Sequence, residues 1–330
     1  MVEKYKVVYL DYIPKEMNDI HREYTPPEFE YITMESKDPQ ERIEKAKDAD
    51  FYMMAGAKID KAMIDLAPRL KLIHHQGVGF EKTDIEYATL KKIPVCTTPA
   101  GTVDCVAEHT VMLILSCMRQ LILADRELRK GNFLVWELRN TSYSLLGKTI
   151  GLIGFGRIGK SLTKLLLPFN VKILFFDKFV KLSLEEQRKY GVTQVNTMDE
   201  LAVQSDVISV HMPLIPEDVG YISTNSLFGK MKPTSIFINT ARGPLVNEGD
   251  LYDVLKNRKI AAAGIDVFEK EPTDVSNPLF TLDNIILTPH IAGGTRDAQI
   301  ERAKFMFGNM KSVLEGKPLQ SCLNADKIKQ

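Results

Sequence analysis

The segment Lys148–Gly159 reads KTIGLIGFGRIG and decides the fold of the second half of the chain. An apolar run is followed at once by glycines at positions 154, 156 and 159, and then by the helix-compatible segment SLTKLLLPF. In this pattern Gly154 allows a tight turn, Gly156 lets the backbone approach a pyrophosphate, and Gly159 lets the helix pack on the strand. The helix N-terminus offers unpaired N–H groups to phosphates. The segment therefore predicts a strand, a turn and a helix that bind a dinucleotide.

An acid at the expected distance supports this prediction. The apolar run VKILFF ends at Asp177, 23 residues beyond Gly154, where roughly 20 are expected for the acid that binds a ribose. A carboxylate there hydrogen-bonds the ribose hydroxyls and repels a 2′-phosphate, which predicts NAD in preference to NADP. Lys178 weakens that preference, because a neighbouring cation could accept a phosphate. Glycines that serve only a strand-to-helix turn are the alternative, and strand, helix and acid together disfavour it.

Short apolar runs alternate with polar amphipathic segments along the whole chain. The first series is YKVVYLDYI, FEYITM, ADFYMMAG, LKLIHHQG and IPVCTTP, and the second is KTIGLIGFG, VKILFFD, DVISVHM, SIFINTA, AAAGIDV and NIILTPH. Such alternation is typical of parallel strands joined by helices. We expect an α/β protein with two Rossmann-like or flavodoxin-like doubly wound parallel sheets. Long helices are expected at about 103–130 and 295–314.

The composition limits the classes of function. A chain of 330 residues favours two domains, and 43 basic against 43 acidic residues leave no net charge to attract nucleic acid or a membrane. The longest apolar stretch, Val111–Cys117, is far shorter than the ~20 residues of a membrane span, and the N-terminus lacks a signal-peptide pattern, so we expect a cytoplasmic protein. The four cysteines have no zinc-site spacing, which predicts no metal and no disulfide framework, each thiol being a small buried hydrophobe.

Polar residues collect just beyond the strands of the second series, where doubly wound sheets bind ligands. Arg242 follows SIFINTA and can hold a carboxylate bidentately, and His290 follows NIILTP and can exchange a proton near neutral pH. Glu271 in GIDVFEKEP is the natural carboxylate partner of that histidine. Each residue alone would more often be structural. Their shared place in a nucleotide-binding lobe predicts catalysis.

The sequence closely resembles the D-isomer-specific 2-hydroxyacid dehydrogenase family through GLIGFGRIG, HMPLIPE, INTARGPLVNE, GIDVFEKEP and LTPHIAG, in that order. The resemblance implies that Arg242 binds substrate, that His290 is the general acid/base and that Glu271 is its partner. It also implies that Asp266 contacts the nicotinamide carboxamide, while Glu269 has no assigned partner. The cofactor site would comprise Gly154, Phe155, Gly156, Arg157, Ile158, Gly159, Asp177, His211, Thr240, Ala241, Arg242, Asp266, His290 and Gly293.

The family also implies how the lobes are built. The substrate-binding domain would be residues 1–101 and 293–330, and the NAD-binding domain, residues 102–292, would be inserted between them. Val78 and Gly79 match the loop whose amides receive the substrate carboxylate, together with Arg242 and His290; a plain strand-to-helix turn is the alternative. Phe80-Glu81-Lys82 departs from the family pattern, so this loop does not identify the substrate.

The segment VAEHTVMLIL resembles the family's dimer helix, and the arm with Trp136 would embrace a second subunit, so a homodimer is expected. The alternative for Trp136 is packing within its own chain. Met53 and Met54 are expected in the core, although a flexible apolar wall would suit an apolar 2-oxo acid.

The resemblance implies an NAD-dependent oxidoreductase that reduces a 2-oxo acid with NADH to a D-2-hydroxy acid. Glyoxylate or hydroxypyruvate, 3-phosphoglycerate and a D-lactate-like substrate stay open, and Lys58 or Lys82 could hold a phosphate. The rival is an NAD(H)-sensing binding protein of the C-terminal-binding co-repressor type, with little turnover.

Overall fold

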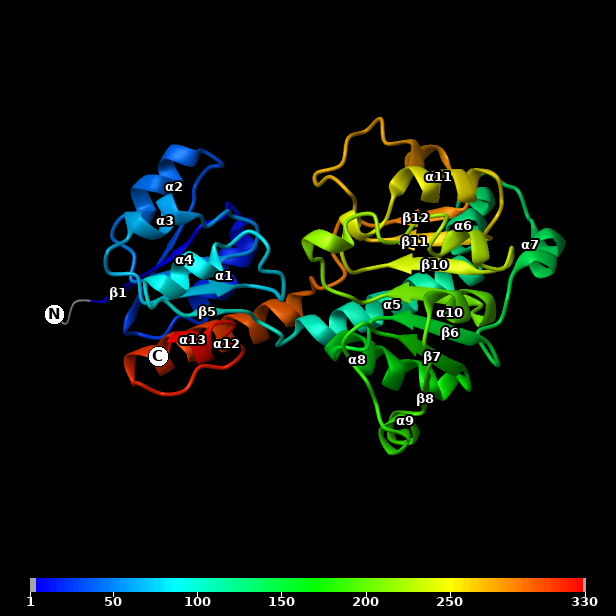
Figure 1. The fold of residues 1–330 in the computed structure, drawn as a ribbon. Coiled ribbons are helices and arrows are strands. Elements are labelled where there is room, and N and C mark those ends of the chain that lie inside the picture. The colour runs from blue at the N-terminus through cyan, green and yellow to red at the C-terminus, as the bar shows by residue number, and fades with distance from the viewer. Residues whose placement is uncertain (1–3, 329–330) are drawn as a thin grey trace. The chain divides into compact units, whose positions relative to one another are not determined.

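The computed structural model describes residues 4–328, which form two compact units (Figure 1). Unit 1 comprises the described residues of Met1–Thr102 and Gly293–Gln330, and unit 2 is Val103–Ala292. The division falls one residue from the domain boundary expected at 101/102, and on it at 292/293. Unit 2 is therefore an insertion into the sequence of unit 1.

Unit 1 contains a five-stranded parallel sheet in the order β2-β1-β3-β4-β5, the flavodoxin-like order. Its strands are β1 Tyr5–Tyr9, β2 Phe29–Thr33, β3 Phe51–Met54, β4 Leu72–His75 and β5 Val95–Cys96. Its helices are α1 Lys15–Glu23, α2 Pro39–Ala46, α3 Lys61–Leu66, α4 Ile85–Leu90, α12 Arg296–Leu314 and α13 Ala325–Ile328. The long helix α12 begins where Thr295 caps it by accepting from the Ala298 amide, as Thr side chains do at helix starts.

Unit 2 contains a seven-stranded parallel sheet in the order β12-β11-β10-β9-β6-β7-β8, which is the Rossmann order extended by one strand. Its strands are β6 Thr149–Ile153, β7 Lys172–Phe176, β8 Val192–Gln194, β9 Val207–Val210, β10 Ile236–Asn239, β11 Ala262–Ile265 and β12 Ile285–Leu287. Its helices are α5 Thr102–Met118, which begins at the last residue of unit 1, α6 Leu121–Arg129, α7 Val135–Thr141, α8 Arg157–Leu166, α9 Leu184–Tyr190, α10 Met198–Gln204 and α11 Glu248–Lys256. Short 3₁₀ turns are η1 Leu167–Phe169, η2 Pro216–Asp218, η3 Phe228–Lys230, η4 Gly243–Leu245 and η5 Pro278–Thr281. The expected α/β class with two doubly wound sheets is confirmed.

Each sheet is covered on both faces, so successive residues of a strand are apolar whichever face they point to. In β1, Val7 and Tyr9 belong to one core cluster and Val8 to the other. Met53 and Met54 divide in the same way and are fully buried, which confirms that they are core residues. Each unit therefore has its own core on both sides of its own sheet.

The prediction of a single helix at 103–130 is wrong in one respect. The segment forms two helices, α5 and α6, which differ in direction by 59° and are separated at Gln120, whose φ is +49°. Within the described residues no single helix is long and apolar enough to cross a membrane. The bent pair α5 and α6 has the length and apolar composition of a span only when both helices are taken together.

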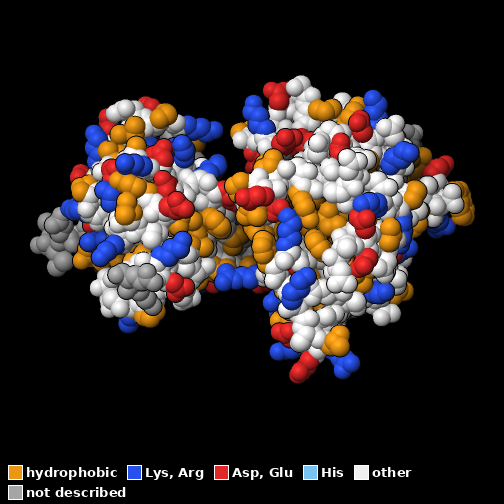
Figure 2. Space-filling model, viewed as in Figure 1, with side chains coloured by type: hydrophobic (Ala, Val, Ile, Leu, Met, Phe, Trp, Pro, Cys, Tyr) orange, Lys and Arg blue, Asp and Glu red, His pale blue; other side chains and the backbone are white. Residues whose placement is uncertain are grey.

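Charges of both signs are interspersed over the face shown in Figure 2, in keeping with the balanced composition. No group of three or more histidine, cysteine or acidic side chains among residues 4–328 is close enough to hold a metal ion.

Candidate functional site

In the glycine turn between β6 and α8, two of the three glycines have no room for a side chain and the third has open space beside it. Gly154 has φ +99°, and a Cβ atom there would lie 2.7 Å from the carbonyl of His211. A Cβ on Gly159 would lie 2.8 Å from the carbonyl oxygen of Gly154, whereas a Cβ on Gly156 would meet no heavy atom within 4 Å. The first and third glycines are thus required by the turn and the helix packing, while the second faces open space that a phosphate can fill.

The start of α8 is a second feature that suits an anion. Gly156 is its N-cap residue and supplies no side-chain hydrogen bond, so the first amides of the helix, including those of Arg157 and Ile158, have no capping side chain. Phe155 is fully buried and stacks on Phe175 with 4.3 Å between ring centroids. Phe155 therefore offers a ligand only its backbone.

Asp177 is fixed at the end of β7 by three backbone amides. Its Oδ2 accepts from Phe155 at 2.7 Å, and its Oδ1 accepts from Phe179 and Val180 at 2.8 Å each. Because a carboxylate can accept about four hydrogen bonds, one acceptor site stays available for a ribose hydroxyl. The direct bond to Phe155 also ties this acid to the glycine turn.

The neighbouring Lys178 is already paired. Its ammonium group contacts the carboxylate of Asp218, which is almost fully buried, and lies 3.7 Å from the ring centroid of Tyr221. These contacts hold the cation with protein partners, which reduces its capacity to attract a 2′-phosphate.

His211 follows β9 and has a buried nitrogen without a protein partner. Its Nε2 lies 2.9 Å from the Ser209 hydroxyl, while Nδ1 has no hydrogen-bond partner among the described residues. Burial lowers the pKa of His211 to about 3, so the ring is neutral at physiological pH. A buried, unpartnered ring nitrogen beside the glycine turn is suited to a polar group of a ligand.

His290 and Glu271 form a short polar contact at this edge of the sheet. Glu271 Oε2 lies 2.6 Å from His290 Nδ1, and its Oε1 accepts from the Phe268 amide at 3.0 Å. Burial raises the pKa of Glu271, but the hydrogen bonds from His290 and Phe268 outweigh it, with smaller contributions from the charges of His290 and Arg242, and hold the pKa below its usual value. The carboxylate is therefore charged at neutral pH and orients the imidazole through Nδ1.

Arg242 is brought toward this pair by the glycine that follows it. A Cβ atom on Gly243 would lie 1.9 Å from the Phe268 backbone, so only glycine allows the turn after β10 to contact the segment that carries Glu271. Arg242 Nη1 donates to the Ala241 carbonyl at 2.7 Å, and the charge of Arg242 acts on the Glu271 carboxylate. The structure thus brings the three predicted catalytic residues together within unit 2.

Asp266 is fully buried and anchors the loop that carries His290. Its carboxylate accepts from the Thr288 hydroxyl at 2.5 Å and from the Ile291 and Ala292 amides at 2.9 and 2.8 Å, and its backbone carbonyl accepts from the His290 amide at 2.7 Å. His290 itself has φ +55°, a conformation that these bonds maintain. The nicotinamide contact expected of Asp266 stays a prediction.

Three further residues near Asp266 went unnoticed in the sequence. His109 Nε2 lies 3.1 Å from the Thr288 hydroxyl and 3.6 Å from Asp266 Oδ1. Thr110 bonds the hydroxyl of Thr240 at 3.0 Å, and Thr240 is buried. The only sequence signal for these contacts is the position of Thr288 two residues before His290, since His109 and Thr110 lie far away in the chain.

The remaining predicted residues belong to unit 1. Val78 and Gly79 follow β4, and their amides donate to no acceptor among the described residues. The strand end before them is fixed, because the Gln76 side chain contacts Tyr9 and Gln299. Gly293 also lies in unit 1, where its carbonyl accepts from the Arg302 guanidinium.

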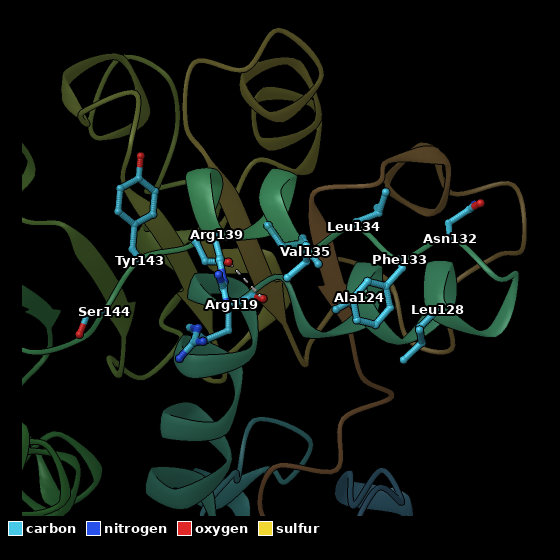
Figure 3. Close-up of a pocket in the computed structure, with 12 residues that line it drawn as sticks. Arg119, Ala124, Leu128, Asn132, Phe133, Leu134, Val135, Arg139, Tyr143 and Ser144 are labelled. Carbon is cyan, nitrogen blue, oxygen red and sulfur yellow. Dashed lines mark hydrogen bonds between the residues drawn. The ribbon is translucent and has the colours of Figure 1, made fainter.

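A hollow of about 490 Å³ lies elsewhere, on α6, α7 and the segment between them. Figure 3 shows Leu128, Phe133 and Ala124 gathered on one side of it, with Arg119 and Arg139 beside them. None of the predicted catalytic or cofactor residues lines it.

A Rossmann-ordered sheet with an open glycine turn, an acid at the end of β7 and a histidine–glutamate pair is the arrangement of a dinucleotide-dependent oxidoreductase. The family model described as "D-isomer specific 2-hydroxyacid dehydrogenase, NAD binding domain" matches residues 111–292. The chain belongs to this family, which confirms the resemblance seen in the sequence and, at the level of the family, an oxidoreductase that acts on a CH–OH group.

Curated relatives agree. A D-3-phosphoglycerate dehydrogenase of Archaeoglobus fulgidus is 39% identical over 82% of this chain, and the chain spans only 50% of that relative. A glyoxylate reductase of Thermofilum pendens is 38% identical over 90% of this chain and 89% of its own length.

Solved structures share the architecture. The D-lactate dehydrogenase of Escherichia coli matches with a TM-score of 0.82 and 26% identity, over 96% of this chain and 99% of that one. An acyclic imino acid reductase in complex with NADPH and D-Arg matches with a TM-score of 0.83 and 28% identity, over 96% of this chain and 99% of that one. A nicotinamide cofactor is supported, because the family model is that of an NAD binding domain and the imino acid reductase structure contains NADPH.

Proposed function

We propose that the protein is an NAD-dependent D-2-hydroxyacid dehydrogenase that reduces the C2 carbonyl of a 2-oxo acid. The observation that carries the proposal is the 2.6 Å contact between His290 and Glu271, with Arg242 close enough to act on the same carboxylate. A ketone reductase needs a proton donor for the forming alkoxide and a cation for the substrate carboxylate, and this cluster supplies both.

The residues divide the work as follows. His290 gives its Nε2 proton to the alkoxide, and Glu271 holds the ring through Nδ1 and stabilises the imidazolium before transfer. Arg242 binds the substrate carboxylate. In unit 1, the amides of Val78 and Gly79 donate to no acceptor among the described residues and remain the loop that the family resemblance assigns to a substrate carboxylate. The bound nicotinamide supplies the hydride.

NADH is the proposed cofactor. The open position at Gly156 and the uncapped start of α8 would hold the pyrophosphate, and Asp177 would bind the ribose of the adenosine. The free Nδ1 of His211 would face the same nucleoside. A preference over NADPH rests on the charge of Asp177 and on the pairing of Lys178 with Asp218.

The substrate we favour is small and carries no phosphate. Lys82 already donates to the Gly56 carbonyl at 3.0 Å, and Lys58 pairs with Asp60 at 3.4 Å, so both lysines considered for a phosphate have protein acceptors. Glyoxylate and hydroxypyruvate therefore rank ahead of 3-phosphoglycerate. The glyoxylate reductase relative, which this chain matches over most of both lengths, supports that order.

The test is NADH oxidation with a panel of 2-oxo acids and the His290→Ala variant. We expect the wild-type chain to turn over at least one of glyoxylate, hydroxypyruvate, pyruvate, phenylpyruvate and 3-phosphoglycerate. The variant should lose about 10²–10⁴-fold in kcat with nearly unchanged NADH affinity. A wild-type chain that binds NADH but turns over slowly with every acid would favour the NAD(H)-sensing alternative and contradict the proposal.

A homodimer is the proposed assembly, with α6, α7 and their connection as the contact surface. This surface exposes large apolar side chains, among them Leu128, Phe133 and Trp136, around the hollow. A second copy is the occupant we favour because the arm with Trp136 lies on this surface and follows the segment VAEHTVMLIL of α5, which resembles the family's dimer helix. Phe133→Asp should yield monomers in analytical ultracentrifugation, whereas Phe179→Asp, equally exposed but outside the surface, should leave the dimer intact. A monomeric wild-type chain would refute the assembly.

A further inference from the structure

Two of the four cysteines are cross-strand neighbours in unit 1. Cys96 ends β5, and Cys322, in the segment after α12, forms an isolated antiparallel bridge with it. The pairing is held on both sides by two backbone bonds, Thr97 N to Ser321 O at 3.1 Å and Leu323 N to Val95 O at 2.8 Å. Sequence spacing cannot reveal this contact, because the two cysteines lie 226 positions apart in the chain.

The hydrogen-bond pattern identifies the kind of pair. The bonds come from the residues flanking the cysteines, so Cys96 and Cys322 face each other as a non-hydrogen-bonded antiparallel pair. In such pairs the Cα atoms are about 4.5 Å apart, which lies inside the range of about 4.4–6.8 Å that a disulfide needs. The backbone therefore already has a spacing at which the two sulfurs can bond.

Side-chain anchors hold the segment in this register. Asn324 Oδ1 accepts from the Val95 amide at 2.9 Å, and Asn324 Nδ2 donates to the Ile93 carbonyl at 3.0 Å. The hydroxyls of Thr97 and Ser321 lie 2.8 Å apart. A slip of one residue, which would separate the thiols, would break all of these bonds.

The two thiols also differ in exposure and in pKa, as the attacking and resolving thiols of a reactive pair do. Cys96 is fully buried, whereas Cys322 is partly exposed. The hydrogen bond from the Cys96 thiol, aided by bonds from Asn324, Val95 and Ala325, lowers the pKa of Cys322 to about 6 despite burial, while the same bond raises the pKa of Cys96. Cys322 is thus the accessible thiolate, and Cys96 is the thiol behind it.

We propose that Cys96 and Cys322 form a redox-active pair that a low-molecular-weight disulfide converts to an intramolecular disulfide. The Cys322 thiolate attacks one sulfur of the oxidant and releases the other half as a thiolate, leaving a mixed disulfide on Cys322. Cys96 then loses its proton to solvent and attacks the Cys322 sulfur, and the second half of the oxidant leaves as a thiolate. The two cysteines are oxidised by two electrons, and the oxidant is reduced to two thiols.

The bond would tie the segment after α12 to β5, at the edge of the unit 1 sheet. It closes a loop of more than two hundred residues, and long loops are those for which a cross-link restricts the unfolded chain most. Oxidation should therefore raise the thermal midpoint of unfolding, and reduction with dithiothreitol should restore the original value.

The test uses the full chain carrying Cys105→Ser, which removes the other partly exposed thiol. Burial raises the pKa of Cys117 to about 12, so that thiol is an internal control that should stay reduced. After incubation with oxidised glutathione we expect a mass loss of two hydrogens, a linked peptide containing Cys96 and Cys322, and reversal by dithiothreitol. An unchanged mass, a stable glutathione adduct or a link to Cys117 would each overturn the proposal.

Single variants establish the order of the steps. In Cys96→Ser the reaction should stop at a glutathione adduct on Cys322, since the resolving thiol is missing. In Cys322→Ser no adduct should form on the buried Cys96. Rapid modification of Cys96 in the second variant would contradict the proposed order, and circular dichroism of both variants checks that the fold is retained.

Discussion

Replacing Glu271 by glutamine changes one charge and almost no volume. The amide oxygen of the glutamine can still accept from the Phe268 amide, as Oε1 does in the wild type. Its NH₂ group then faces His290 Nδ1, where the carboxylate Oε2 lies at 2.6 Å. An imidazolium carries a proton on Nδ1, so donor would meet donor and the proton-donating form of His290 would lose its partner.

The size of the loss follows from the contact. A hydrogen bond to a charged group contributes about 1.5–3 kcal/mol. The side chains of His290 and Glu271 are 50% and 36% exposed, so solvent screens the pair, and the lower part of that range, about 1.5–2 kcal/mol, applies. Because about 1.4 kcal/mol corresponds to tenfold, kcat should fall by about 10–30-fold.

The measurement is steady-state NADH oxidation with the best 2-oxo acid, together with NADH affinity by fluorescence titration. Glu269→Gln is the matched control, since it makes the same chemical change two residues away at an exposed side chain, while His290 bonds Glu271. Wild-type turnover in Glu271→Gln, or an equal loss in both variants, would refute the role assigned to this carboxylate.

The other predictions concern the cofactor and the cores. Asp177→Ala should weaken NADH binding about tenfold and narrow the preference over NADPH, whereas Lys178→Met should change the preference little; an unchanged preference in the first variant would contradict the ribose role. Gly156→Ala should weaken NADH binding without lowering the thermal midpoint, and Gly154→Ala should lower the midpoint, because only the second methyl collides with backbone. Burial lowers the pKa of His74 to about 3. Its ring should therefore stay neutral in NMR spectra at pH 5, where the unfolded chain is protonated. His74 alone then lowers the free energy of unfolding by about 1.6 kcal/mol as the pH drops from 6.5 to 5, and an imidazolium signal from this residue in the folded protein would contradict this.

Periodicity in the sequence was sufficient for the fold, since apolar runs of strand length recur between amphipathic segments in both units. The break between α5 and α6 was not predictable in the same way. Gln120 is neither glycine nor proline, and its left-handed conformation ends α5 without a local signal. The edge strand β8 was also missed, because its three residues, VTQ, make too short a run to stand out.

Candidate site residues could be predicted where the chemistry lies within one segment. Glycine spacing singled out Gly154, Gly156 and Gly159, and strand ends singled out Arg242 and His290. Long-range partners required the structure. The contact of His109 with Thr288 and the pairing of the two cysteines join positions whose separation in sequence carries no pattern.

The acids of GIDVFEKEP show that chemically similar residues in one short segment have different roles because they lie in different surroundings. Asp266 and Glu271 are chemically similar, yet Asp266 is fully buried and its carboxylate accepts hydrogen bonds from Thr288, Ile291 and Ala292, whereas Glu271 is partly exposed and bonds the imidazole. One acid therefore determines where the backbone of His290 lies, and the other determines how its ring is oriented and charged. Loss of Asp266 would move the backbone of His290. Loss of Glu271 would leave His290 in place, but its imidazolium would have no acceptor for the Nδ1 proton. The two variants should consequently differ in structure even where they agree in lost turnover.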